Sequence, residues 1–520
     1  MKTGSAKRST GKNIVLTISA SLLAKLMVLL QSSVISAVFG ANADVDVMFY
    51  MMSLIISVTT FASAVNQLVL IANIIQAEMN GPAEAYRRLV RFLYTVYTGI
   101  GLVFAAAFFF FGKPLLLVLT AFDSAAIDRC LPLIRVMAAV VFLSVVNTYL
   151  MDLFTSFKIF VLPMVNDLIK SALIIGFVLL PAGRSSVTMV AWGMLAAYAL
   201  QFVSIQFLFK RTSGFWLAFS AGNISLQARK NTFFVMVSQC ATFIESMVII
   251  GIVSTLPAGY FTAVTLARKL SVTVMNVLIV QFATVVGIDL IEYSHAGEEA
   301  KLERSFHKYL RAANYIILPV TAIIAVNAKP IISILFGYGK FTDDNIDIAA
   351  KALAVLALML VTTLWDAFFQ RLVVARQLQS KTWHFQVLQS AIRLVLIFFL
   401  NAAIGYLGIA VGLVLGNLIF VLMLGGWLFR HDYRFMRVAP TVKYTGINLV
   451  FAAAAAGLGV FALRFFETGR GFLENAVFLV LSSAVMLLVY AGLGLCYKGN
   501  RESLSALAAL FRGKLRGGSR

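Results

Sequence analysis

Hydrophobic residues in this chain form long runs that are separated by short polar segments. About fourteen of these runs have roughly 20 residues or more, enough to cross a hydrocarbon core as α-helices. The pattern therefore predicts an all-α polytopic membrane protein with spans at residues 14–40, 47–76, 92–112, 131–154, 159–181, 187–209, 231–255, 261–288, 309–328, 347–370, 383–402, 406–429, 444–463 and 472–496.

Composition and charge agree with this topology and orient it. The chain is 61% hydrophobic and 12% charged, and its net charge is +21. Lys and Arg concentrate in the N-terminal tail and in loops after even-numbered spans, such as 77–91, 210–230 and 430–443. Because short cytoplasmic loops collect basic residues, both termini are predicted to be cytoplasmic. The same bias, with attraction to anionic membrane lipids, accounts for the net charge without a nucleic-acid partner.

A repeat divides the predicted helices into two sets of six. Residues 113–119 (KPLLLVL) resemble residues 329–335 (KPIISIL), and the resemblance continues from Asp152 to Asp366 and from Lys170 to the neighbourhood of Arg393. Since six is an even number, both copies enter the membrane from the same side. We therefore expect two six-helix lobes related by a parallel pseudo-twofold axis, followed by two C-terminal helices.

The repeat also sets the expected domain boundaries. They are a cytoplasmic tail (1–13), a first lobe (14–210), a cytoplasmic linker (211–230), a second lobe (231–430), helices 13 and 14 (431–497) and a basic cytoplasmic tail (498–520).

Charged residues inside the apolar runs are the main functional signal. Lys25 lies near the middle of the first run, where insertion of an ammonium group costs roughly 3 kcal/mol. Such charges usually face a polar cavity inside a helix bundle, so they indicate a transporter. The other charges inside or at the ends of runs are Asp152, Lys170, Glu245, Arg268, Lys269, Asp366 and Arg393.

The sequence contains no motif for an enzyme or an ATP-driven motor. There is no GxxxxGK[ST] loop, GxSxG elbow or HExxH, and the four histidines form no metal spacing. We therefore expect no cofactor and no metal. The membrane potential, an ion gradient or product consumption would supply the energy, and the coupling ion is left open.

Three segments carry a resemblance to a known family. Residues 39–50 (FGANADVDVMFY), 267–270 (ARKL) and 335–342 (LFGYGKFT) resemble segments of the MurJ/MviN lipid II flippases, in the multidrug/oligosaccharidyl-lipid/polysaccharide (MOP) exporter superfamily. Gln239 also fits, and the predicted topology matches over essentially the whole chain. The resemblance implies a monomeric inner-membrane flippase that carries an undecaprenyl-pyrophosphate glycan through a cavity between its lobes.

The resemblance also implies which residues bind the substrate. Cationic positions of the family fall on Lys25 and Lys269, with Arg268 beside the latter, and an acidic position falls on Asp46. Other cationic positions of the family fall on uncharged residues, which favours a divergent member that serves lipid II or a related polysaccharide repeat unit. The uncharged replacements are Gln31, Thr59 and Thr60, and Ser32 replaces an aspartate.

Several of these residues have a structural alternative. Asp46 would cap the second helix or serve the substrate or a gate. Arg268 and Lys269 point about 100° apart, so Lys269 is expected in the cavity and Arg268 near an interface or in a pair. Glu245 is a candidate partner of Lys25 across the cavity.

The remaining in-span charges occupy matched places in the repeat. Lys170 and Arg393 would line the cavity or bind lipid head groups. Asp152 and Asp366 would pair with Lys158 and Arg371 or take part in gating.

Three other functions fit the predicted topology less well. A cation-coupled multidrug exporter of the same superfamily would need a carboxylate-lined cavity. An intramembrane glycosyltransferase or polymerase would need a larger periplasmic loop, and a scaffold protein would not need buried charges.

Overall fold

Helices joined by turns and short irregular segments make up the described structure. The computed structural model describes residues 10–66, 74, 83–156, 159, 161–221, 226–376, 378–463, 471–497 and 499–500, and no strand occurs in these ranges. Within the described part, twelve helices are long and apolar enough to cross a membrane. Two further helices correspond to predicted spans, α7 with 19 residues and α10 with a shorter apolar part at Gln239–Val253. The predicted all-helical membrane fold is confirmed.

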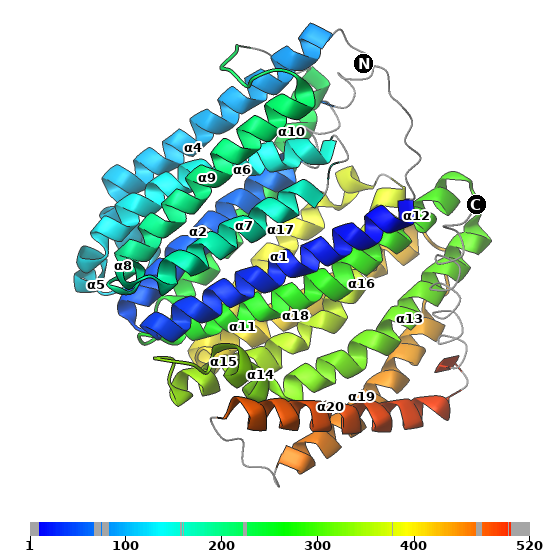
Figure 1. Cartoon of the computed structure of the whole chain (residues 1–520). Helices are drawn as coiled ribbons and strands as arrows, with labels where there is room; N and C mark the ends of the chain where they lie inside the picture. Colours follow the sequence, from blue (N-terminus) through cyan, green and yellow to red (C-terminus); the bar gives the residue numbers. More distant parts are fainter. Residues whose placement is uncertain are drawn as a thin grey trace.

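The first lobe contains the helices of the first six predicted spans (Figure 1). They are α1 (Thr10–Phe39), α2 (Ala43–Val65), α4 (Ala83–Leu119), α6 (Leu131–Ser156), α7 (Val161–Leu179) and α9 (Val187–Ser213), with short helices α5 (Ser124–Arg129) and α8 (Pro181–Arg184) at the connections.

The second lobe repeats this arrangement with several broken helices. It contains α10 (Leu226–Val253), α11 (Tyr260–Met275), the π-helix η2 (Asn276–Val280), α12 (Gln281–His295), α13 (Glu299–Val326), α14 (Ala328–Phe336), α15 (Asp343–Ala357), α16 (Met359–Ala375), α17 (Gln379–Ile404) and α18 (Leu407–His431). The last two helices are α19 (Ala439–Leu463) and α20 (Phe472–Leu495), and they lie against α13 and α14.

Helix packing confirms the two-lobe repeat. In the first lobe α1 packs on α7, α6 on α9, and α7 on α9. The equivalent pairs in the second lobe are α10 with α17, α16 with α18, and α17 with α18. An ion pair repeats as well, because Lys113 bonds Asp128 at 2.6 Å and Lys329 bonds Asp347 at 2.8 Å.

Helix ends differ from the predicted spans where helices continue beyond an apolar run. The third span was expected from residue 92, but α4 begins at Ala83 and includes the basic segment around Arg87 and Arg91. The eighth was expected to end at 288, but the helix continues through η2 and α12 to His295. A hydrophobic run marks where a helix enters hydrocarbon, whereas the helix itself stops only at a break in its backbone hydrogen bonds.

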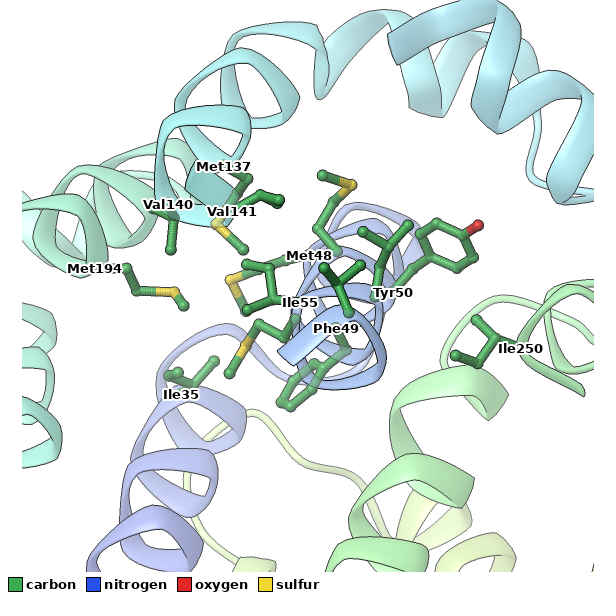
Figure 2. Close-up of a cluster of buried hydrophobic side chains, with 14 of the residues drawn as sticks. Ile35, Met48, Phe49, Tyr50, Ile55, Met137, Val140, Val141, Met194 and Ile250 are labelled. Carbon is green, nitrogen blue, oxygen red and sulfur yellow. The ribbon is translucent and has the colours of Figure 1, made fainter. Parts of the chain in front are cut away.

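The second helix, α2, lies at the centre of the hydrophobic core. Met48 and Ile55 of α2 face Met137 and Val141 of α6, and Met194 of α9 closes the cluster (Figure 2). On its other sides α2 contacts α10 and α11 of the second lobe. These contacts bury most of α2, although Ile56 and Thr60 remain exposed.

Candidate functional site

The two lobes are joined at one end of the bundle. We call this the closed end; it contains the turn after α1 (residues 40–42), residues 119–122, 254–262 and 335–342. Here the Lys340 backbone N–H donates to the Ala37 carbonyl at 2.9 Å, and the Ala121 N–H donates to Ser254 Oγ at 2.9 Å. The hydroxyl of Ser33 also donates to the Leu335 carbonyl.

Glycines permit the close backbone approach at this end. Gly339 has φ +64°, and a Cβ there would collide with the carbonyl oxygen of Ala37. Gly40 has φ +77°, and a Cβ there would lie 2.8 Å from the carbonyl oxygen of Lys340. Both positions require the left-handed conformation and lack room for a side chain, which explains two glycines of the motifs at 39–50 and 335–342.

Asp46 caps a helix of the opposite lobe. Its buried carboxylate accepts hydrogen bonds from the Gly259 N–H (2.6 Å), the Thr262 N–H (2.9 Å) and Thr262 Oγ1 (2.5 Å). Those N–H groups belong to the first turn of α11, which has no intrahelical partners for them and carries a positive partial charge. The expectation that Asp46 caps the second helix is therefore wrong, and its carboxylate holds the lobes together.

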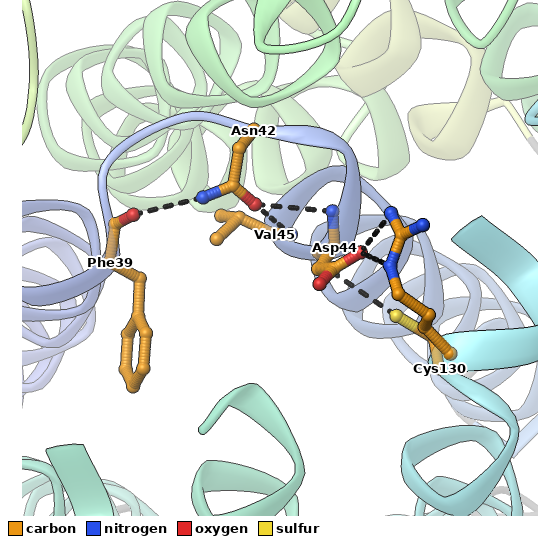
Figure 3. A network of polar contacts seen from close by, with 6 residues as sticks. Phe39, Asn42, Asp44, Val45 and Cys130 are labelled. Carbon is orange, nitrogen blue, oxygen red and sulfur yellow. Dashed lines mark hydrogen bonds and ion pairs between the residues drawn. The ribbon is translucent and has the colours of Figure 1, made fainter. Parts of the chain in front are cut away.

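Asn42 is the residue that caps α2. Its side chain accepts from the Asp44 and Val45 N–H groups and donates to the Phe39 carbonyl (Figure 3). Asp44 also pairs with Arg129 at 2.9 Å, near Cys130. Burial, reinforced by the Asp44 charge, raises the pKa of the Cys130 thiol to about 12, so this cysteine is a packing residue.

Lys269 lies at the interface between the lobes. Its Nζ donates to Ser32 Oγ of α1 at 3.0 Å and stands 4.9 Å from the centre of the Phe49 ring of α2. The neighbouring Arg268 points elsewhere, within electrostatic range of Glu245 and Arg393. The two side chains diverge as expected, with Lys269 bonded to the first lobe and Arg268 among charges of the second.

A polar network crosses the first lobe. Lys170 of α7 bonds Asp167 of the same helix at 2.7 Å, and Gln201 of α9 donates to the same carboxylate at 3.2 Å. Asn147 of α6 donates to Gln201 at 3.1 Å, and Lys25 of α1 lies within electrostatic range of Asp167. We call Lys25, Asn147, Asp167, Lys170 and Gln201 the first-lobe network.

A matching network crosses the second lobe. Arg393 of α17 bonds Glu245 of α10 at 3.1 Å and donates to Asn417 of α18 at 2.9 Å. Ser390 donates to Glu245 at 2.6 Å, and Asn417 donates to Thr362 of α16 at 2.8 Å. These five residues are the second-lobe network. Glu245 is thus bonded within its own lobe, and the predicted Lys25–Glu245 pair is wrong.

The two networks differ in exposure. The Asp167 side chain is 45% exposed, whereas that of Glu245 is 5% exposed. Lys170 and Arg393 are similar, at 16% and 15%. Lys25 is exposed on α1. The first-lobe network therefore offers a carboxylate and a lysine to a ligand, and the second is a closed ion pair.

The two matched aspartates have polar neighbours. Buried Asp152 accepts hydrogen bonds from Ser63 of α2 (3.1 Å) and from Asn66, the residue after α2 (2.9 Å), and Asp366 accepts one from Gln370 (3.2 Å) of its own helix. The proposed partner Lys158 lies outside the described residues.

Six residues of the networks were not predicted from the sequence: Asp167, the amides Asn147, Gln201 and Asn417, and the hydroxyl residues Ser390 and Thr362. Asp167 sits three positions before Lys170 inside an apolar run, a spacing that puts both on one helix face, so its role was available from the sequence. The amides Asn147, Gln201 and Asn417 gave no such signal, because uncharged polar residues are common inside spans. Among the described residues, no group of three or more His, Cys, Asp or Glu side chains is placed to hold a metal.

The fold is shared with solved transporters. A lipid II flippase MurJ in an inward closed conformation matches with a TM-score of 0.73 at 16% identity, covering 91% of this chain and 98% of that chain. An inward-facing multidrug resistance MATE family transporter matches with a TM-score of 0.63 at 16% identity, covering 80% and 97%. A MOP superfamily transporter from Pyrococcus furiosus matches with a TM-score of 0.59 at 17% identity, covering 80% and 94%. At these identities the likeness shows the fold alone.

Sequence comparison identifies the family. A probable lipid II flippase MurJ from Bdellovibrio bacteriovorus is 22% identical over 257 residues, which are 49% of this chain and 48% of the relative. This match thus spans about half the length of the curated relative. The family model for lipid II flippase MurJ matches residues 35–481, most of the chain. The chain therefore belongs to the lipid II flippase MurJ family.

Proposed function

We propose that this protein moves an undecaprenyl-pyrophosphate-linked glycan across the inner membrane by alternating access. The observation that carries the proposal is the excess of cations inside the helix bundle. Arg268 and Lys269 have no carboxylate within ion-pair distance among the described residues, and Lys25 is exposed beside a carboxylate already bonded to Lys170. A polyanionic head group supplies the missing negative charge, because unpaired charge in hydrocarbon is strongly unfavourable.

The closed end provides the gate of this cycle. The positive-inside pattern supports a periplasmic position for the closed end, and with that orientation the lobes in this structure would admit substrate from the cytoplasm. Opening that end requires α11 to lose the Asp46 carboxylate and the glycine-rich segments to separate. The lipid tail stays in the bilayer while the head group crosses between the lobes.

The family match favours lipid II or a close relative as the substrate. The family model and the Bdellovibrio relative are both described as lipid II flippases. A divergent set of cavity residues, with Ser32 and Thr59 where the family has charges, supports a related polysaccharide repeat unit as the variant form. Energy would come from the membrane potential, worth about 2.3 kcal/mol per charge per 100 mV, or from removal of the product.

The exporter and enzyme alternatives are less well supported. A carrier of cationic drugs would need accessible carboxylates between its lobes. In the described structure, Asp46 and Glu245 are buried and bonded to protein groups, and Asp167 is paired with a lysine.

Translocation in vesicles tests the proposal. The full chain is reconstituted with lipid II, and the fraction reaching the opposite leaflet is measured by an impermeant enzyme that modifies the glycan. Time-dependent transfer is expected, and Lys25→Ala should reduce it strongly. The proposal fails if neither lipid II nor an O-antigen-like lipid pyrophosphate crosses faster than in protein-free vesicles.

Complementation gives an independent answer. A bacterial strain depleted of its own lipid II flippase should grow when it expresses this chain if lipid II is the substrate. Expression at the membrane without rescue, together with transfer of an O-antigen-like lipid in vesicles, would assign the polysaccharide form instead.

A further inference from the structure

Asp167 occupies an unusual position for a carboxylate in a membrane-spanning helix. It lies in the first half of α7, bonds Lys170 at 2.7 Å and Gln201 at 3.2 Å, and stands within electrostatic range of Lys25. Its side chain is nevertheless 45% exposed. A carboxylate facing lipid would be strongly disfavoured, so this exposed surface faces a polar space between helices.

The groups around Asp167 have contacts that do not involve it. Lys170 is only 16% exposed, and its ammonium stands 4.7 Å from the centre of the Tyr198 ring, a cation–π contact independent of Asp167. Gln201 is buried and is held by Asn147. The site is thus a preformed set of donors with one exposed acceptor in it.

We propose that Asp167 is a displaceable counter-ion that occupies the place of a phosphate group. When a phosphate or pyrophosphate binds, its oxygens accept from Lys170 and Gln201 and face Lys25, and the Asp167 carboxylate turns away. The identity of the anion as part of a lipid-linked substrate rests on the proposed function; the exchange itself does not.

The chemistry of the donors suits such an exchange. A lysine ammonium has three donors on a compact charge, so it can hold the departing carboxylate and the arriving phosphate together. An amide such as Gln201 can donate to a carboxylate oxygen or to a phosphate oxygen. In the empty state Asp167 balances one of the two lysine charges and reduces the repulsion between Lys25 and Lys170 inside the bundle.

The second-lobe network lacks the features for this exchange. Glu245 is 5% exposed, and Ser390 and Arg393 both bond it. The guanidinium is further bonded to Asn417, and its unbonded nitrogen, Nε, is buried, so an incoming anion finds no accessible donor. We therefore assign phosphate exchange to the first lobe alone.

The proposal is tested by measuring the affinity of the full chain for an anion. The protein is purified in detergent, and its binding of inorganic pyrophosphate is measured by calorimetry. Asp167→Asn should bind pyrophosphate at least about tenfold more tightly than the wild type, because a like charge is removed from the site. Lys170→Gln should bind at least about tenfold more weakly, and Asp167→Glu should stay within about threefold of the wild type. A purely structural role for Asp167 predicts no gain in affinity.

Asp128→Asn is the matched control. It removes the same charge from an exposed ion pair with Lys113, at 2.6 Å, outside the networks, and should leave pyrophosphate affinity unchanged. The proposal is overturned if folded Asp167→Asn binds pyrophosphate no more tightly than the wild type. If that variant does not fold, Asp167→Ser repeats the test. Unfolding of both also contradicts the proposal, because a group that leaves Lys170 during transport cannot be required for folding.

Two further experiments distinguish failure of this inference from failure of the proposed function. Farnesyl pyrophosphate should bind more tightly than inorganic pyrophosphate if the site serves a lipid head group, and equally if it serves free phosphate. Tighter binding by Asp167→Asn without any lipid transfer in vesicles would keep the exchange site and reject the flippase. Lipid transfer with no tighter binding would keep the flippase and reject the exchange.

Discussion

The two polar networks hold equivalent positions of the repeat, but they are built from different residues. Gln201 of α9 and Asn417 of α18 are the central amides of their networks. Gln201 is bonded to a polar residue of α6 and Asn417 to one of α16, which belong to the fourth predicted span of their lobes. The first network keeps its acid and base on one helix and leaves the acid half exposed. The second places them on two helices and buries the acid.

This difference shows how one scaffold can serve two purposes. An ion pair between α10 and α17 ties two helices together, so its loss affects the lobe as a whole. The Lys170–Asp167 pair lies within α7, its carboxylate is joined to α9 only by the hydrogen bond from Gln201, and it remains available to a ligand. We therefore assign a structural role to the second-lobe network and a binding role to the first.

The largest effect is expected when the buried pair is broken. Glu245→Ala leaves the Arg393 guanidinium buried without its carboxylate, and should destabilise the folded protein by about 3–5 kcal/mol. Asp167→Asn should cost less, because the Asp167 side chain is 45% exposed and the asparagine oxygen can still accept from Lys170 and Gln201. Unfolding of the purified variants in detergent measures both. Equal losses at the two sites would refute the division of roles.

The double variant Glu245→Leu/Arg393→Met sharpens this prediction. It removes both charges and should recover most of the stability lost in Glu245→Ala, because two apolar side chains of similar volume need no pairing. No recovery would mean that Arg393 is needed for more than its bond to Glu245.

The next effect concerns transport by the first network. Lys170→Gln should lower lipid transfer per folded protein by about thirtyfold or more, since a lost charged contact to the substrate costs about 2 kcal/mol or more. The vesicle assay measures this, with thermal stability measured on the same samples. Transfer at the wild-type rate would place substrate binding elsewhere, at Lys269 or Arg268.

An intermediate effect is expected at the closed end, where the lobes join. Asp46→Ala removes the cap of α11 and should destabilise the closed arrangement by about 1–2 kcal/mol, favouring opening at that end. The backbones of Ala37 and Lys340 are in contact, so cysteines at these two positions can report on closure. They should cross-link less in the Asp46→Ala variant than in the protein that keeps Asp46. Unchanged cross-linking would show that the glycine contacts alone hold this end closed.

The smallest effect is expected where the lobes are most alike. Lys113→Ala and Lys329→Ala each remove one exposed ion pair, and each should cost less than about 1 kcal/mol. Thermal unfolding of the two variants should therefore give similar shifts. A markedly larger loss at one site would show that the repeat is asymmetric at this position as well.

Most of the fold was predictable because membrane helices are recognised in a sequence by their length and apolar composition. The all-helical fold, the two lobes and the repeat of Lys113 at Lys329 all followed from patterns within the chain. Helix ends such as Ala83 of α4 were missed. Polar residues mark the end of a membrane span, but the helix can continue through them into water.

The identities of most charged residues inside the apolar runs also followed from the sequence, since such charges are rare and conspicuous, although Asp167 was missed. Their partners did not. Asp46 bonds Gly259 and Thr262, which lie more than 200 residues away in the other lobe, and Glu245 bonds Arg393 and not Lys25. A side chain's partner depends on the rotation of its helix and on which helices pack beside it, and apolar runs record neither. The sequence alone established which charges enter the membrane, and the packing of the two lobes decided which of them are neutralised by the protein and which are left for a ligand.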